Sequence, residues 1–87
     1  MIKTDFSIGK EFWCGYNKWL CTDVGSRIIT AIRISGNHEV FSNGDKKILD
    51  EDAMKNGRWF AGPPYQVEEV VFDEEDQESC SEEEIHV

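Results

Sequence analysis

The sequence predicts a mainly β protein, a small antiparallel SH3-like barrel with one or two short helices and an acidic C-terminal segment. Turn-forming glycine and asparagine residues recur at short intervals in the 87 residues, and β-branched and aromatic residues are common between them. Glycine and asparagine accept positive φ, so they close hairpins at little cost. Five or six short strands in about 70 residues is the scale of such a barrel.

Two hairpins are expected in the first half of the chain. A turn formed by the stretch GYNK places Cys14 opposite Trp19 and Phe12 opposite Cys21. A second hairpin is expected in residues 38–49, because an Asn-Gly pair divides two short stretches that contain β-branched and aromatic residues.

Two further strands are expected from their apolar patterns. In residues 27–34 the side chains alternate with a period of two, and Ile28, Ile32 and Ile34 share the face that we expect to point inward. Residues 65–72 need a β-bulge at Glu68-Glu69 to bring their apolar side chains onto one face. The expected core consists of Phe12 or Trp13, Trp19, Ile28, Ile32, Ile34, Val67 and Phe72.

Two short helices are predicted from their end signals. The stretch LDEDAMKNG offers Asp50 as the N-cap and Gly57 as the residue that ends the helix. The stretch FDEEDQESC offers Asp73 as the N-cap and places acidic residues in the first turn, where the helix dipole favours them.

The chain is expected to form one domain. Residues 1–80 would make a single small barrel with a short C-terminal helix, and residues 81–87 an acidic tail that frays. The pattern EFWCG…WLCTDVGSR…GPPY…VVFDE, which covers about three quarters of the chain, resembles small uncharacterised bacterial and phage-borne proteins. This resemblance implies a compact domain in an intracellular setting, and it implies no activity.

Charge divides the sequence into two unequal parts. Residues 1–58 hold all nine lysines and arginines and eight acidic residues, whereas residues 59–87 hold ten acidic residues and no lysine or arginine. The net charge of −9 argues against direct binding of nucleic acid, which requires a basic face for the phosphates. It is compatible with a partner that is itself basic.

The acidic end is the leading candidate for a functional site. We expect a non-enzymatic interaction protein whose carboxylates bind a basic protein surface, as in an inhibitor (an anti-CRISPR or similar protein) of a nucleic-acid-handling complex. As one helix, residues 73–84 would space their eight charges about 2.2 Å apart, near the roughly 1.7 Å of duplex DNA. A solvated tail is the alternative. The candidate residues are Glu68, Glu69, Asp73, Glu74, Glu75, Asp76, Glu78, Glu82, Glu83 and Glu84.

The cysteines suggest a second hypothesis, a small metal-binding or redox module. Cys14, Cys21 and Cys80 could meet if the last helix returns Cys80 to the first hairpin. The only close pair has the spacing C-x6-C, which is not the spacing of a zinc site, so no metal or other cofactor is expected. Buried reduced thiols or a disulfide remain as alternatives.

No catalytic motif is present in the sequence, and we expect no enzyme. Neither His38 nor His86 belongs to a recognisable catalytic arrangement. No apolar run approaches the roughly 20 residues of a membrane span, and no signal peptide is recognised, so a cytoplasmic protein is expected. An alternative recognition surface would be formed by the aromatic residues Trp13, Trp19, Trp59, Phe60 and Tyr65, if they do not serve the core.

Overall fold

A computed structural model describes residues 1–83, apart from the side chain of Ser42. Its elements are η1 (Lys3–Asp5), β1 (Glu11–Cys14), β2 (Asn17–Val24), β3 (Ile29–Arg33), β4 (His38–Ser42), β5 (Asp45–Leu49), α1 (Glu51–Asn56), β6 (Glu69–Phe72), α2 (Glu74–Glu78) and β7 (Cys80–Ser81). The predicted mainly β class with antiparallel strands and two short α-helices is confirmed.

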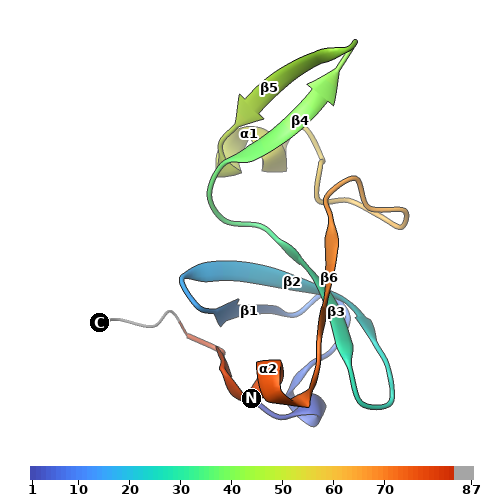
Figure 1. Cartoon of the computed structure of the whole chain (residues 1–87), viewed down its shortest axis with the longest axis vertical. Coiled ribbons are helices and arrows are strands. Elements are labelled where there is room, and N and C mark those ends of the chain that lie inside the picture. The colour runs from blue at the N-terminus through green and yellow to red at the C-terminus, as the bar shows by residue number, and fades with distance from the viewer. Residues whose placement is uncertain (84–87) are drawn as a thin grey trace.

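The strands form two separate sheets. One has five strands in the order β6-β3-β2-β1-β7, and the other is the hairpin β4-β5. The hairpin and α1 lie at one end of the molecule, and α2 and η1 lie at the other (Figure 1). Within residues 1–83 the five-stranded sheet stays open, with β6 and β7 at its edges, so a closed barrel is not found.

One face of the five-stranded sheet carries the main core. Phe12 is fully buried and packs edge-on against Phe6 and Phe72, with ring centroids 5.0 and 5.5 Å apart. Such aromatic pairs add to the hydrophobic gain of burial. The buried members of this core are Phe6, Phe12, Cys21, Ile29, Ala31, Phe72 and Cys80.

The predicted inward face of β3 is partly wrong. Ile28 precedes the strand and is 41% exposed, whereas Ile29 and Ala31 are fully buried in the main core. Ile32 is fully buried as predicted, but it points to the opposite side of the sheet from Ile29 and Ala31. Both faces of β3 are therefore covered, and a pattern of period two cannot tell which apolar face meets the larger core.

Trp19, Ile34 and Val67 are half-buried rather than central. Trp19 packs against the main core from β2, whereas Ile34 follows β3 and Val67 precedes β6. All three were predicted as core residues. Of the predicted core, Phe12, Ile32 and Phe72 are buried.

The register of the first hairpin differs from the prediction. Cys14 pairs with Asn17 and Phe12 pairs with Trp19, so the turn contains two residues and not four. The reason is local: Gly15 has a φ of 65°, which lets the chain reverse immediately after Cys14.

The predicted bulge also lies elsewhere. The register shift occurs between Cys21 and Asp23 in β2, and β6 begins only at Glu69. Val70 and Phe72 then point inward in simple alternation, and no extra residue is needed.

The second hairpin and α1 follow their local signals. The turn between β4 and β5 is made by Asn43 and Gly44, whose φ angles are 53° and 82°. Asp50 caps α1 by accepting a hydrogen bond of 2.8 Å from the amide of Ala53, and Gly57 is the C-cap. Both predictions are confirmed.

The acidic run forms a shorter helix than the charge-spacing estimate assumed. α2 is capped by Asp73, as predicted, but it ends at Glu78 and covers about 7.5 Å. Cys80 and Ser81 then pair with β1 as strand β7. A single helix with DNA-like charge spacing along residues 73–84 is therefore wrong for the described part of this stretch. Within residues 1–83, no helix has the length and apolar character needed to cross a membrane.

Candidate functional site

The acidic helix α2 closes one end of the five-stranded sheet. It follows β6 directly and leads into β7, and these two strands are the opposite edges of the sheet. The chain between Phe72 and Cys80 must therefore cross the end of the sheet (Figure 1). The acidic residues of α2, for which a solvated tail was the alternative, thus form part of the folded chain between two strands of the sheet.

Gln77 fixes α2 to the domain. Its side chain is 2% exposed, although every other residue from Asp73 to Glu78 is exposed. Its amide nitrogen donates hydrogen bonds of 3.1 Å to the carbonyl oxygens of Phe72 and Arg27. Gln77 is not among the site residues predicted from the sequence. The available signal was that Gln77 is the one uncharged residue in the stretch DEEDQE.

The N-terminus of α2 is held by a reciprocal cap. The Asp73 carboxylate accepts a hydrogen bond of 2.8 Å from the Asp76 amide, and the Asp76 carboxylate accepts one of 3.2 Å from the Asp73 amide. These two carboxylates satisfy amides that a helix start leaves free. Asp73 and Asp76 therefore serve the fold as well as the charge of the surface.

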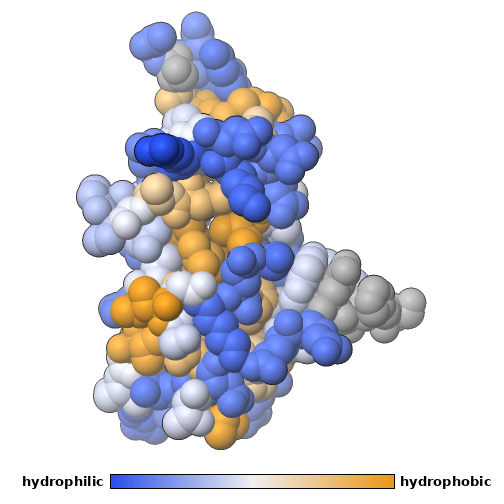
Figure 2. Space-filling model, turned by 180° about the vertical axis from the view of Figure 1, so that it is seen from behind, coloured by the Kyte–Doolittle hydropathy of each residue, from blue (hydrophilic) through white to orange (hydrophobic). Residues whose placement is uncertain are grey.

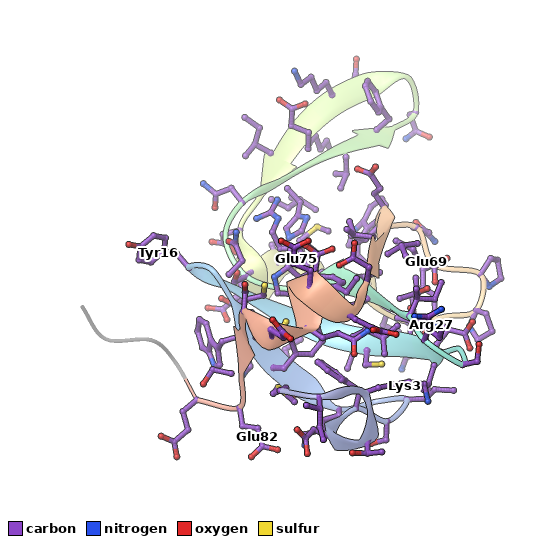
Figure 3. All side chains as sticks on the ribbon, turned by 60° about the horizontal axis from the view of Figure 1, so that its bottom comes forward. Lys3, Tyr16, Arg27, Glu69, Glu75 and Glu82 are labelled. Carbon is purple, nitrogen blue, oxygen red and sulfur yellow. The ribbon has the colours of Figure 1, made fainter. Side chains whose placement is uncertain are left out.

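All the predicted acidic residues that the structure describes are exposed, and Glu84 lies outside the described residues. Glu75 lies on α2 and Glu82 follows β7 at this end of the molecule, whereas Glu69 stands apart from them at the start of β6 (Figure 3). The three residues come from β6, from α2 and from the stretch after β7, so the acidic residues are distributed over several elements and not along a single helix. We call this set, residues Glu68, Glu69, Asp73, Glu74, Glu75, Asp76, Glu78, Glu82 and Glu83, the acidic face.

Besides Asp73 and Asp76, three members of the acidic face have side-chain partners within the domain. Glu74 forms an ion pair of 2.9 Å with Arg27, and Glu82 pairs with Lys10. Glu69 accepts a hydrogen bond of 3.0 Å from the Thr22 hydroxyl. Exposed ion pairs contribute little to stability.

Four carboxylates of the acidic face keep their charge unpaired. Within residues 1–83, no ion pair or side-chain hydrogen bond involves the carboxylates of Glu68, Glu75, Glu78 and Glu83. Glu75 and Glu78 lie on the anchored helix α2. These two carboxylates are therefore fixed in position and not neutralised by an ion pair within residues 1–83.

A cleft of about 450 Å³ is lined by residues of β2, β3, β4, α1 and the stretch around the start of β6. Apolar surface is also visible between the two ends of the molecule in the view of Figure 2. His38 lines the cleft, is 8% exposed and packs edge-on against Phe60 at 5.6 Å. Among the residues that the structure describes, its Nε2 atom has no hydrogen-bond partner. Burial, and then the charge of Arg33, lower the pKa of His38, so the ring is neutral at pH 7. The described lining contains no serine, threonine or cysteine that this imidazole could activate.

The three cysteines do not form one site. Cys14 pairs with Cys80 across β1 and β7, whereas Cys21 pairs with Ala31 in the main core. Residues 1–83 contain no group of three histidine, cysteine or acidic side chains that could hold a metal ion. Burial raises the pKa of the Cys21 thiol and, together with the Cys14 thiol, raises that of Cys80 to about 12. Metals bind thiolates, so this chemistry disfavours the three-cysteine metal hypothesis.

The aromatic residues do not form one recognition surface. Trp19 shares the face of Phe12 and packs edge-on against Phe72 at 4.9 Å. Trp13, next to Phe12 in β1, points to the other side of the sheet. Phe60 packs against His38 beside the cleft. His86, the second candidate histidine, lies outside the described residues.

The chain matches no family model, and searches of curated proteins and of solved structures likewise return no significant match. Its function is therefore argued from its own geometry.

Proposed function

We propose that this protein is a non-enzymatic interaction protein whose acidic face binds a basic surface on another protein. The observation that supports this proposal is the anchoring of α2. Gln77 and the reciprocal cap hold the helix in place, while Glu75 and Glu78 stay exposed and unpaired. A solubilising tail needs charge but no such order.

Anchoring matters because binding has an entropic cost. A segment that orders only on binding loses conformational freedom at that moment, which weakens the complex. The acidic face has already lost this freedom on folding, and its charges stand at fixed positions. Fixed charges complement one partner surface better than others, whereas a mobile acidic run attracts any basic surface.

The basic surface that we propose is the nucleic-acid-binding groove of a protein complex. Such grooves concentrate lysine and arginine to hold phosphates, so their positive charge complements the negative charge of the acidic face. Occupying the groove would exclude nucleic acid, which is how an inhibitor such as an anti-CRISPR protein would act. Such an inhibitor would act in the cytoplasm and would be encoded by a phage or plasmid. That the five-stranded sheet is related to an SH3-like barrel stays a prediction.

The proposal is tested by reversing charge at the acidic face. The double variant Glu75→Lys and Glu78→Lys changes two exposed side chains that have no ion pair within residues 1–83. The control Asp45→Lys and Asp52→Lys makes the same change in net charge on β5 and α1, at the opposite end of the molecule (Figure 1). Both double variants should fold, because all four positions are exposed.

Immobilised parent and variants are used to capture proteins from a bacterial lysate at low salt, and each captured protein is identified and titrated in pure form. A partner of the acidic face should lose at least about tenfold in affinity for the Glu75/Glu78 variant, and the control should bind nearly as the parent does. Raising salt to about 0.5 M should weaken the parent complex. The nucleic acid that the partner binds should compete with the parent protein for the partner's basic groove. Equal binding of both variants would refute the acidic face as the recognition surface.

A further inference from the structure

Strand β7 brings two cysteines together that are far apart in the sequence. Cys14 and Cys80 are direct partners in the antiparallel pair of β1 and β7. Directly opposed residues in such a pair have Cα atoms about 4.5–5.5 Å apart. Disulfides bridge Cα separations of about 4.4–6.8 Å. The two cysteines therefore sit at bridging distance without any movement of the backbone.

The environments of the two thiols differ. Cys80 is 5% exposed, and its thiol lies 3.3 Å from the carbonyl oxygen of Asp76. Burial, and then the neighbouring Cys14 thiol, raise the pKa of Cys80. Cys14 is only half-buried, so it is the thiol that a dissolved oxidant reaches first. Cys21, in the main core, has Ala31 as its strand partner.

We propose that Cys14 and Cys80 form a disulfide by exchange with a low-molecular-weight disulfide such as oxidised glutathione, and that this bond clamps the acidic helix to the sheet. The Cys14 thiolate attacks one glutathione sulfur and releases one glutathione thiolate, which takes up the proton that Cys14 lost. The Cys80 thiol then loses its proton and attacks the Cys14 sulfur, and the second glutathione leaves with that proton. Two protein thiols are oxidised, and one glutathione disulfide is reduced to two glutathione molecules.

The position of the bond gives it a consequence for α2. The strand β7 has only two residues, and the described chain after α2 is otherwise held by a hydrogen bond from the N-terminal amine to the Cys80 carbonyl and by the Lys10–Glu82 ion pair. Cys80 lies two residues after the end of α2, so a disulfide at Cys80 would join the C-terminal end of this helix to β1. The N-terminal end of α2 is already joined to the sheet because it follows β6 directly. With this bond, opening of the β7 ladder would leave the C-terminal side of α2 tied to β1, in addition to the hold of Gln77 on the helix. Oxidation therefore favours the ordered acidic face.

The bond itself is tested on the full chain. The protein is equilibrated with mixtures of oxidised and reduced glutathione, free thiols are alkylated, and peptides are mapped without reduction. The expected product has lost two hydrogens, contains a Cys14–Cys80 linked peptide and is alkylated at Cys21 alone. Cys21→Ala should give the same linked peptide, and Cys14→Ser should give none. Alkylation of all three cysteines at every ratio, a bond that includes Cys21, or a bond between two chains would overturn the proposal.

The clamp is tested by thermal unfolding of the two redox forms. Closing the long loop from residue 14 to residue 80 should raise the Tm of the oxidised parent by at least about 5 °C over the reduced form. The Cys14→Ser variant should show no difference under the same conditions. A Tm that does not rise on oxidation of the parent would overturn the clamp.

The effect on binding rests on the proposed function. A partner captured through the acidic face should dissociate from the oxidised protein at least about twofold more slowly than from the reduced protein. Capture of no such partner by either form would refute the proposed function and leave the disulfide standing. Capture with equal dissociation rates would refute the regulation alone.

Discussion

Gln77 offers the sharpest test of how the acidic helix is held. We predict that Gln77→Met destabilises the domain, because methionine has nearly the same length and volume but cannot donate a hydrogen bond. The side chain is 2% exposed and donates to the carbonyl oxygens of Phe72 and Arg27, both at 3.1 Å. The substitution keeps the packing and removes both donors.

The size of the effect follows from these two contacts. A hydrogen bond contributes about 1 kcal/mol to stability, and a buried polar group left without a partner costs about 1–3 kcal/mol. The larger apolar character of methionine offsets part of this loss. We therefore expect the free energy of unfolding to fall by about 2–3 kcal/mol, out of roughly 5–10 kcal/mol for a domain of this size.

The assay is urea unfolding of the parent, of Gln77→Met and of the control Glu78→Met. The control introduces the same residue at the neighbouring exposed position, and its free energy of unfolding should stay within about 0.5 kcal/mol of the parent. Hydrogen exchange at the amides of α2 should become faster in Gln77→Met and not in the control. If the free energy of unfolding of Gln77→Met lies within about 0.5 kcal/mol of that of the parent, the two hydrogen bonds do not hold the helix.

Two further predictions concern the rest of the domain. Because the pKa of His38 is lowered from its usual value of 6.5, the unfolded chain takes up a proton first as pH falls, and the free energy of unfolding should decrease below about pH 6.5. This decrease, measured by urea unfolding between about pH 8 and 5.5, should be shallower in His38→Gln, and equal slopes would contradict the assignment. Ile32→Asp should unfold the domain, whereas Ile28→Asp at a 41% exposed position should be tolerated. Circular dichroism melting of both variants decides this, and a folded Ile32→Asp would contradict the burial of that side chain.

Local signals in the sequence predicted local structure well. Asp50 and Asp73 were predicted as helix caps, and the pair Asn43-Gly44 was predicted as a hairpin turn. Each of these features is decided by contacts within about four residues, such as a carboxylate that accepts the amide three positions ahead. Such contacts form in much the same way whatever surrounds them.

Features that depend on distant partners were predicted poorly. The predicted inward face of β3 was partly wrong because both faces of the strand carry buried side chains. Alternation of apolar residues does not show which of the two faces packs against the larger core. The first hairpin was out of register because a turn of two residues at Gly15 and a longer turn both suit the sequence.

The sequence by itself determined the strand-rich class, the two capped helices and the concentration of acid after Arg58. Only the tertiary structure decided how the acidic helix is anchored to the sheet. Arg27, whose carbonyl accepts from Gln77, lies 50 residues earlier in the sequence. Cys14 lies on β1, which is separated from β6 by β3 and β2 in the sheet. No local pattern encodes such a meeting, because the partners come from segments far apart in the sequence that only the assembled five-stranded sheet brings together.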